Sequence, residues 1–268
     1  MEELYVFGTG HAAVTRCYNT CFAIKRGTEY FMTDAGGGNG ILRILQDMKV
    51  DMGDIHHIFV THEHTDHILG IVWMIRFIGT RILSGRYEGD LYLYCHRELT
   101  STIDTLCRLT LQKKLHSLIG DRIHLTAVED GETRNILGAE VTFFDIRSTK
   151  AMQYGFTTIL ENGKRLTCCG DEPFNPACTS YVKGSAWMLH EAFCLYSDRE
   201  RFQPYEKHHS TVKDACILAG EMNVENLVLW HTEDTDLPHR KERYTAEGRP
   251  FFGGALHVPD DGDIIKLV

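Results

Sequence analysis

The chain has 268 residues, 43% of which are hydrophobic, and it carries a formal net charge of −9 at pH 7. This length and hydrophobic content allow a sizeable core, whereas the acidic balance argues against bulk nucleic-acid binding, because phosphate contacts need clustered Lys and Arg. No apolar run approaches the ~18 residues that a membrane span requires and no secretory signal is evident at the start, so we expect a cytoplasmic protein with no membrane partner.

The first half of the chain alternates strand-like and helix-like segments. Apolar runs separated by Gly- and Asp-rich turns predict strands at residues 4–7, 20–24, 30–33 and 57–60. Apolar spacing predicts a helix over residues 40–49 and a buried helix over residues 68–78. A further strand is expected at Leu91–Cys95, followed by one or two helices within residues 99–118.

The second half of the chain repeats this mixture. Apolar runs predict strands at residues 140–146, 155–160, 165–169, 187–192 and Asn226–Trp230. Residues 212–222 have helix spacing. The basic segment 239–243 is expected to be a solvated charged turn, or to attract phosphate at the mouth of a site. The nine cysteines are scattered and contain no Cys-x-x-Cys pair, which indicates reduced thiols.

The most informative segment is residues 61–67, Thr-His-Glu-His-Thr-Asp-His, which follows an apolar run. Imidazole nitrogens and ionised carboxylates are common metal ligands. His62 and His64 lie two positions apart, so in an extended segment they point the same way, and Asp66 and His67 follow one turn later. The segment therefore predicts two adjacent metal sites at the end of a strand. The alternative, an exposed loop that happens to be rich in histidine, is disfavoured by the order of the motif after a buried strand.

Metal-capable residues also follow two other predicted strands. Asp171 follows the strand at residues 165–169, and His231 follows Asn226–Trp230. Donors at the ends of several strands can meet at one edge of a sheet structure, and a strand end is a rigid support. We therefore expect both residues to lie near the histidine cluster.

In this order the residues resemble a known family. The pattern His62-x-His64-x-Asp66-His67 resembles the signature of the metallo-β-lactamase fold superfamily, and further motifs resemble its ribonuclease Z branch. These motifs are Phe7-Gly8-Thr9-Gly10, Tyr18-Asn19-Thr20, Thr33-Asp34-Ala35-Gly36, Cys169-Gly170-Asp171, Leu189-His190-Glu191-Ala192, His209-Ser210-Thr211 and Trp230-His231. The resemblance implies one domain over residues 1–268 with an α/β fold, the αββα sandwich, in which two mixed β-sheets lie face to face and helices flank them.

The resemblance also implies two bound metal ions. The first would be held by His62, His64 and Asp171. The second would be held by Asp66, His67 and His231, with Asp171 bridging both ions. Zinc is the expected metal, with Mn2+ or Fe as alternatives, and a metal-bound hydroxide would attack the substrate.

Three further residues have implied roles that remain open from the sequence alone. Asp66 would also orient the hydroxide, and Glu191 and His209 would protonate the leaving oxygen. A surface acid or helix N-cap is an equal alternative for Glu191, and a solvated loop residue is one for His209. Asp34 would accept a hydrogen bond from a ligand histidine, or form an Asx-turn.

Two departures from the family pattern affect this expectation. The branch has a histidine at the end of the strand before its Gly-Asp turn, where this chain has Arg147, which has no lone pair to give a metal. The first metal site would then be weak, and Arg147→His would raise metal occupancy; Arg147 could instead hold an anionic substrate. Members that process transfer RNA also carry a long arm between these positions, and here two predicted strands already fill the gap to Asp171.

The sequence therefore predicts a metal-dependent hydrolase that cleaves a phosphodiester or similar small anionic substrate. Extended RNA binding is doubtful, and a homodimer is an open expectation. The first alternative is a thioester, lactone or β-lactam hydrolase of the same fold, and the Glu191 and His209 motifs favour the phosphodiesterase over it. The second alternative is a weakened metal-binding protein, because of Arg147.

Overall fold

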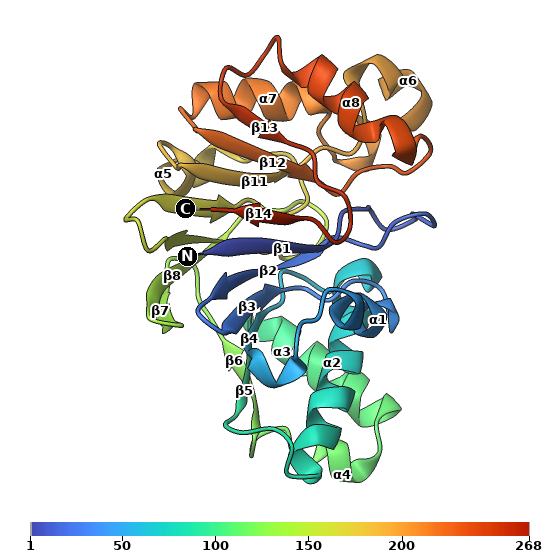
Figure 1. The fold of residues 1–268 in the computed structure, drawn as a ribbon, viewed down its shortest axis with the longest axis vertical. Coiled ribbons are helices and arrows are strands. Elements are labelled where there is room, and N and C mark those ends of the chain that lie inside the picture. Colours follow the sequence, from blue (N-terminus) through green and yellow to red (C-terminus); the bar gives the residue numbers. More distant parts are fainter. Residues whose placement is uncertain (1, 268) are drawn as a thin grey trace.

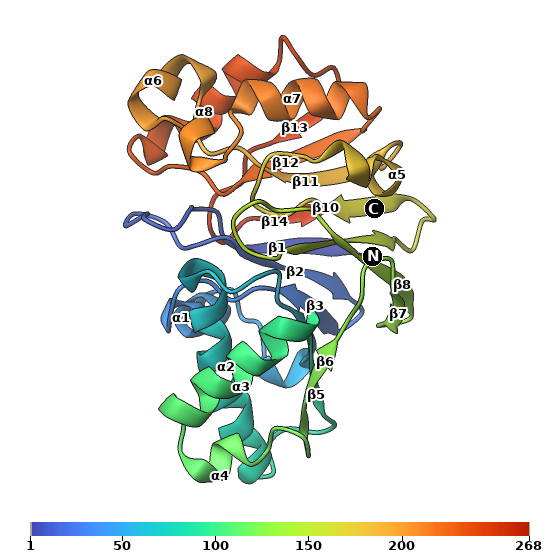
Figure 2. The ribbon, with the colours of Figure 1, turned by 180° about the vertical axis from the view of Figure 1, so that it is seen from behind.

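The computed structural model describes residues 2–267. Two seven-stranded sheets lie face to face, and helices cover the outer face of each (Figure 1). The view from behind shows the same four layers, with α1–α4 on one side and α6–α8 on the other (Figure 2). The predicted αββα sandwich is confirmed.

The first sheet has the strand order β14-β1-β2-β3-β4-β5-β6. Its strands are β1 (Glu3–Gly8), β2 (Cys21–Arg26), β3 (Glu29–Thr33), β4 (Ile55–Phe59), β5 (Leu91–Cys95), β6 (Ile123–Ala127) and β14 (Ile264–Lys266). The helices beside it are α1 (Gly40–Asp47), α2 (Thr65–Leu83), α3 (Arg97–Thr110) and α4 (Lys113–His116). From β3 to β6 the neighbouring strands are parallel, so their carboxyl ends share one edge.

The second sheet has the strand order β13-β12-β11-β10-β9-β8-β7. Its strands are β7 (Thr133–Ile136), β8 (Ala139–Asp145), β9 (Tyr154–Ile159), β10 (Arg165–Cys168), β11 (Trp187–Glu191), β12 (Asn226–Trp230) and β13 (Ala255–His257). Its helices are α5 (Thr179–Val182), α6 (Arg199–Phe202), α7 (Val212–Glu221) and α8 (Leu237–Gly248). From β10 to β13 the neighbouring strands are parallel.

Both faces of each sheet are buried, which explains why most strands are continuous apolar runs. In β1, Leu4 and Val6 belong to the core between the sheets, whereas Tyr5 belongs to the core under the helices. Phe22 of one sheet stacks on Trp230 of the other, with ring centroids 4.4 Å apart. Burying a large apolar side chain of this kind stabilises the fold by about 1.5–3 kcal/mol.

Helix α2 packs unusually close to the loop that follows β3. The Gly70 amide donates a hydrogen bond of 2.8 Å to the Gly36 carbonyl. A Cβ atom at Gly70 would lie 1.8 Å from the Ala35 carbonyl oxygen, so only glycine permits this approach. The contact holds the first turn of α2, with Asp66 and His67, over the carboxyl end of β3.

The structure confirms the predicted helices and strands, with shifts of a few residues at their ends and a longer α2. The sequence did not predict β6, β7, β13, β14, α5, α6 or α8. The interpretation of residues 239–243 as a solvated turn is wrong, because they lie within α8. Arg240 is buried there, since its guanidinium donates hydrogen bonds to the hydroxyls of Thr9 and Thr232 and to the Pro259 carbonyl.

Two further findings bear on function. Strands β9 and β10 are joined by a tight turn at residues 160–164, in which the Leu160 amide donates to the Lys164 carbonyl at 2.8 Å. Within residues 2–267, no helix combines the length and the apolar character needed to cross a membrane.

Candidate metal centre

Polar residues follow strands of both sheets at the edge where their carboxyl ends meet. Asp34 follows β3, Asp171 follows β10 and His231 follows β12. The backbone turns sharply at these points, with φ of 53° at Asp34, 82° at Gly170 and 55° at His231. Left-handed conformations are costly for residues other than glycine and cluster at functional sites. Here they direct side chains from both sheets toward one edge, as the sequence predicted for Asp171 and His231.

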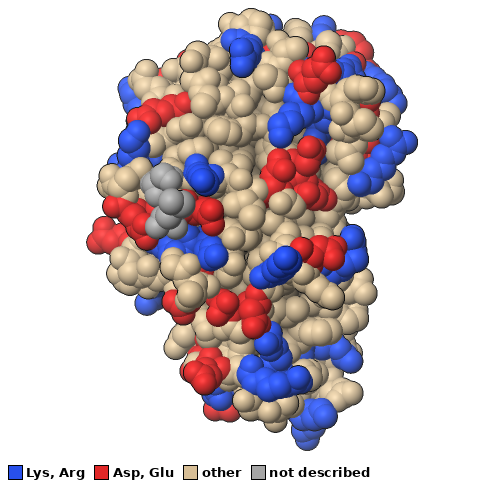
Figure 3. Space-filling model, in the orientation of Figure 1, with Lys and Arg blue, Asp and Glu red and all other residues tan. Residues whose placement is uncertain are grey.

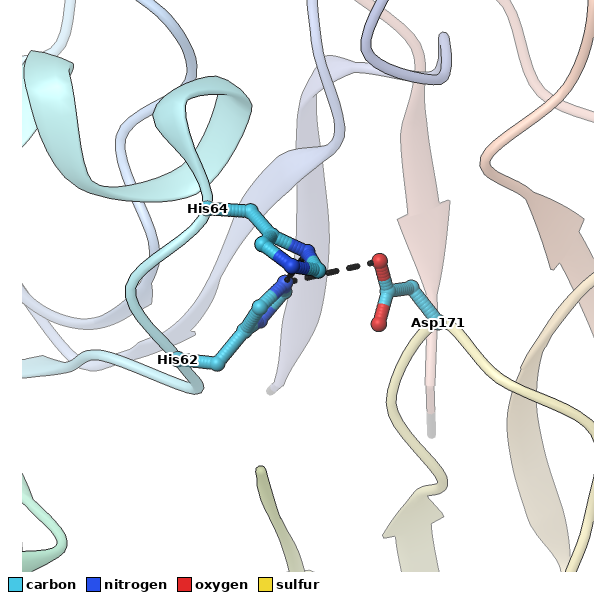
Figure 4. A group of neighbouring side chains, drawn as sticks. All are labelled: His62, His64 and Asp171. Carbon is cyan, nitrogen blue, oxygen red and sulfur yellow. Dashed lines mark hydrogen bonds and ion pairs between the residues drawn. The ribbon is translucent and has the colours of Figure 1, made fainter. Parts of the chain in front are cut away.

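The first group of donors comprises His62, His64 and Asp171 (Figure 4). His62 Nε2 lies 2.9 Å from His64 Nδ1 and 3.6 Å from Asp171 Oδ2. The two histidines belong to the loop before α2, and Asp171 points toward them from the second sheet (Figure 4). The three donor atoms are close enough to hold one ion.

The second group comprises Asp66, His67 and His231. The Nε2 atoms of His67 and His231 lie 3.3 Å and 3.5 Å from Asp66 Oδ2. The same two nitrogens lie 3.4 Å and 3.3 Å from Asp171 Oδ2. Asp171 therefore stands between both groups, where a bridging carboxylate is needed.

The chemistry of these donors fits divalent cations. Both Nε2 atoms, of His67 and His231, are buried and make no hydrogen bond with any described residue. Buried polar atoms nearly always have a partner, and a mixed set of imidazoles and carboxylates suits zinc, iron or manganese. Three protein donors also match catalytic zinc sites, which keep one position open for water or substrate.

The charges of the site are strongly coupled. Burial alone would raise the pKa of Asp66 and of Asp171, but the neighbouring imidazoles outweigh it and hold both pKa values far below the ordinary range. Burial alone would lower the pKa of His67, yet Asp34, Asp66 and Asp171 raise it well above its usual value. The carboxylates are thus ionised, and a divalent cation or a proton on His67 can balance their charge.

Asp34 orients two of the donor histidines. Its Oδ2 accepts hydrogen bonds from His67 Nδ1 and from the Thr61 hydroxyl, both at 2.7 Å. The Thr61 Oγ1 lies 2.9 Å from His62 Nδ1 and, because its own proton goes to Asp34, it accepts from that nitrogen. With Nδ1 held in this way, the imidazoles of His62 and His67 both direct Nε2 toward the other donor atoms. The predicted hydrogen bond from a donor histidine to Asp34 is confirmed.

Glu191 and His209 also lie together at this edge. Glu191 is the last residue of β11 and is fully buried, so it is not a surface acid. Its Oε1 accepts a hydrogen bond from the Ser210 amide, and its Oε2 lies 3.6 Å from His209 Nδ1. The His209 ring stacks on Phe193 with centroids 5.0 Å apart. His209 is therefore held in place and is not a solvated loop residue.

A cavity of about 430 Å³ opens onto the donors. It is lined by His11, Ala12, Glu63, His64, Thr65, Asp66, Lys150, Asp171, His209 and His231. Sequence reasoning missed two of these residues, His11 and Lys150. His11 directly follows the Gly8-Thr9-Gly10 motif, so its position carried a signal. Burial, followed by His231 and His209, lowers the pKa of His11 to about 4, so this imidazole is neutral at pH 7.

Arg147 does not lie at the metal centre, which corrects the hypothesis that it takes a ligand's place. Its guanidinium pairs with Asp145 at 2.9 Å and with Asp130 at 2.6 Å, and its side chain is about half exposed. The left-handed backbone at this position, φ 62°, follows the end of β8. The interpretation of Arg147 as an anion-binding residue in the site is wrong for the same reason.

In the loop between β8 and β9, Gln153 is the residue that contacts Asp171 and His62. It is buried, its Nε2 donates a hydrogen bond to Asp171 Oδ1, and the same atom lies 3.1 Å from His62 Nδ1. The bond occupies the outer oxygen of Asp171 and leaves Oδ2 facing the imidazoles. No sequence pattern distinguished Gln153 from an ordinary loop residue.

We now expect Arg147→His to leave the metal content unchanged, because position 147 is turned toward Asp130 and Asp145. Elemental analysis of both proteins after equilibration with zinc tests this. A gain of bound zinc in the variant would show that the loop can bring position 147 to the donors.

The fold is the metallo-β-lactamase fold, and the chain is similar to ribonuclease Z proteins. A family model described as anti-Pycsar protein Apyc1 matches residues 2–247. The chain belongs to this family.

Individual relatives are distant. The chain is 22% identical over 275 residues to ribonuclease Z of Parabacteroides distasonis, covering 85% of this chain and 88% of that protein. The solved structure of metallo-beta-lactamase fold protein YhfI from Bacillus subtilis matches with a TM-score of 0.77 at 15% identity, covering 99% of this chain and 100% of that one. Human tRNase Z, short form, matches with a TM-score of 0.74 at 18% identity and 99% coverage of both chains. At these identities the structures show the fold alone.

Proposed function

We propose that this protein is a metal-dependent hydrolase that cleaves a phosphodiester bond in a small anionic substrate. One observation carries the proposal: two groups of donors surround Asp171, and His209, which faces the buried Glu191, lines the same cavity. Ribonuclease Z relatives and the family's fold support phosphodiester chemistry. Zinc is the expected metal, with two ions per chain, and manganese or iron as alternatives.

The residues have distinct roles in this proposal. Metal ions bound at the two groups would supply Lewis acidity and lower the pKa of water to about 7. Asp66, at the inner edge of the cavity, would accept a hydrogen bond from the attacking water as well as holding an ion. Because His209 Nδ1 faces Glu191, its Nε2 faces the cavity and would donate a proton to the leaving oxygen. Glu191 would hold that imidazole in place and stabilise its protonated form.

Several features support a small substrate over transfer RNA. The tight turn between β9 and β10 leaves no room for an inserted arm in that connection. On the face drawn in Figure 3, Lys and Arg are interspersed with Asp and Glu and form no continuous basic surface. Backbone phosphates of a long RNA need such a surface. The cytoplasmic location and the homodimer stay predictions from the sequence; light scattering would test the latter.

Matched assays on a phosphodiester and a thioester test the proposed reaction. Zinc-loaded protein is expected to hydrolyse bis(p-nitrophenyl) phosphate, to lose this activity after dialysis against a chelator, and to regain it when zinc is added. An S-aryl thioacetate serves as the comparison substrate for the thioester alternative. Activity confined to the thioester would contradict the proposal.

A further inference from the structure

The loop at residues 146–153 is anchored at both ends and in its middle. The Ile146 amide donates to the Gln153 carbonyl at 3.0 Å, which closes the loop. The Ser148 hydroxyl donates to the buried carboxylate of Glu172 at 2.8 Å, and the Thr149 amide approaches the other oxygen at 3.3 Å. These bonds fix the backbone immediately before Lys150.

The anchored loop presents Lys150 to the cavity. Its Nζ lies 3.5 Å from His209 Nε2, the atom proposed as proton donor. No carboxylate within residues 2–267 lies at ion-pair distance from this ammonium. Lys150 is thus a cation without an anionic partner among the described residues, whereas Ser148 and Thr149 before it both bond to Glu172.

Carboxylates outnumber cationic side chains in the described lining of the cavity, so the position of Lys150 bears on which substrates the cavity can bind. Three carboxylates line it, those of Glu63, Asp66 and Asp171, and Lys150 is the one Lys or Arg in its described lining. An anionic substrate would be repelled by the carboxylates wherever bound cations do not offset them. A lysine ammonium is a point charge suited to phosphate oxygens.

We propose that Lys150 binds a non-bridging phosphoryl oxygen of the substrate, and of the phosphomonoester product, next to the proton donor His209. This rests on the proposed phosphodiesterase function and extends it to a residue that selects anionic substrates. In this position the ammonium places the leaving oxygen within reach of His209 Nε2. It also compensates part of the negative charge of the cavity.

Kinetics and phosphate binding of zinc-loaded variants test this assignment. In Lys150→Gln, KM for bis(p-nitrophenyl) phosphate and the inhibition constant of inorganic phosphate are expected to rise tenfold to a hundredfold, roughly the effect of losing a charge-assisted hydrogen bond. The change in kcat is expected to be smaller. Lys150→Arg keeps the charge and should restore both constants to within about threefold of wild type. The matched control is Lys164→Gln, since Lys164 is exposed and pairs with Glu225 outside the cavity.

The outcomes separate this proposal from the function on which it rests. If Lys150→Gln keeps both constants within about twofold of wild type, Lys150 does not bind the phosphoryl group. A change confined to kcat and its pH profile, with phosphate inhibition unchanged, would mean that Lys150 acts only through His209 and would also overturn the assignment. If wild type hydrolyses no phosphodiester, the proposed function fails. Calorimetric titration of inorganic phosphate into zinc-loaded wild type and Lys150→Gln then still decides whether Lys150 binds the anion.

Discussion

Asp171→Ala is expected to lose both tightly bound metal ions and to lower phosphodiester hydrolysis about a thousandfold or more, equivalent to about 4 kcal/mol. The reason is the position of one oxygen, Oδ2, which lies 3.6 Å or less from the Nε2 atoms of His62, His67 and His231. Removing it deprives both donor groups of their shared carboxylate, so that the first keeps only two imidazoles and the second keeps Asp66 as its one carboxylate. Elemental analysis and initial rates measure the two effects.

A control variant separates metal loss from unfolding. Asp47→Ala removes an exposed carboxylate on α1 that pairs with Arg43, and it should leave metal content and rate unchanged. Thermal unfolding of both variants, with metal removed, should give midpoints close to that of wild type without metal. Retention of two ions by Asp171→Ala would contradict the assignment of this residue as the bridge.

His209→Ala is expected to slow hydrolysis in a way that depends on the leaving group. A general acid contributes typically 10²–10⁴-fold, so a substrate with an alkoxide leaving group should lose roughly this factor. A p-nitrophenolate ester should lose far less, because this leaving group is stable without a proton. Rates for the two substrates under saturating zinc measure the difference.

The neighbouring His208 provides the matched control. Its Nδ1 lies 3.3 Å from the Thr149 hydroxyl, and it is not among the residues that line the cavity. His208→Ala should leave both rates nearly unchanged, whereas Glu191→Gln should show the same leaving-group dependence as His209→Ala. Equal losses for both leaving groups in His209→Ala would contradict its role as proton donor.

The parts of the site that were predictable are those held by strand ends. His62, His64, Asp171 and His231 each follow an apolar run, and parallel strands bring such positions to one edge whatever the details of packing. The hydrogen bond that Asp34 accepts from His67 could be anticipated for the same reason. The strands themselves were visible because both faces of each sheet are buried and their sequences are continuously apolar.

The parts that could not be predicted depend on tertiary contacts of loops. Gln153 and Lys150 reach the site because Glu172 anchors the loop from a different strand end, and no local pattern encodes that contact. Arg147 was wrongly placed at the metal centre because only its position along the chain could be compared with the family pattern. Its left-handed backbone and its ion pairs with Asp130 and Asp145 could not be predicted from the sequence.

Two missed elements have a similar explanation. Strand β7 is an edge strand with the sequence TRNI, of which only Ile136 is buried. It therefore contains no apolar run from which a strand could be predicted. Helix α8 is rich in charged residues, and its buried face depends on Arg240 and Tyr244, which are polar side chains with specific partners.

The central claim is that two metal ions share Asp171 at the edge of the sandwich. Zinc-loaded crystals measured at the zinc absorption edge test it most directly, by the number and positions of anomalous peaks. We predict two peaks per chain, one beside His62 and His64 and one beside Asp66, His67 and His231, with Asp171 between them. A single peak, or two peaks that do not both contact Asp171, would contradict the claim.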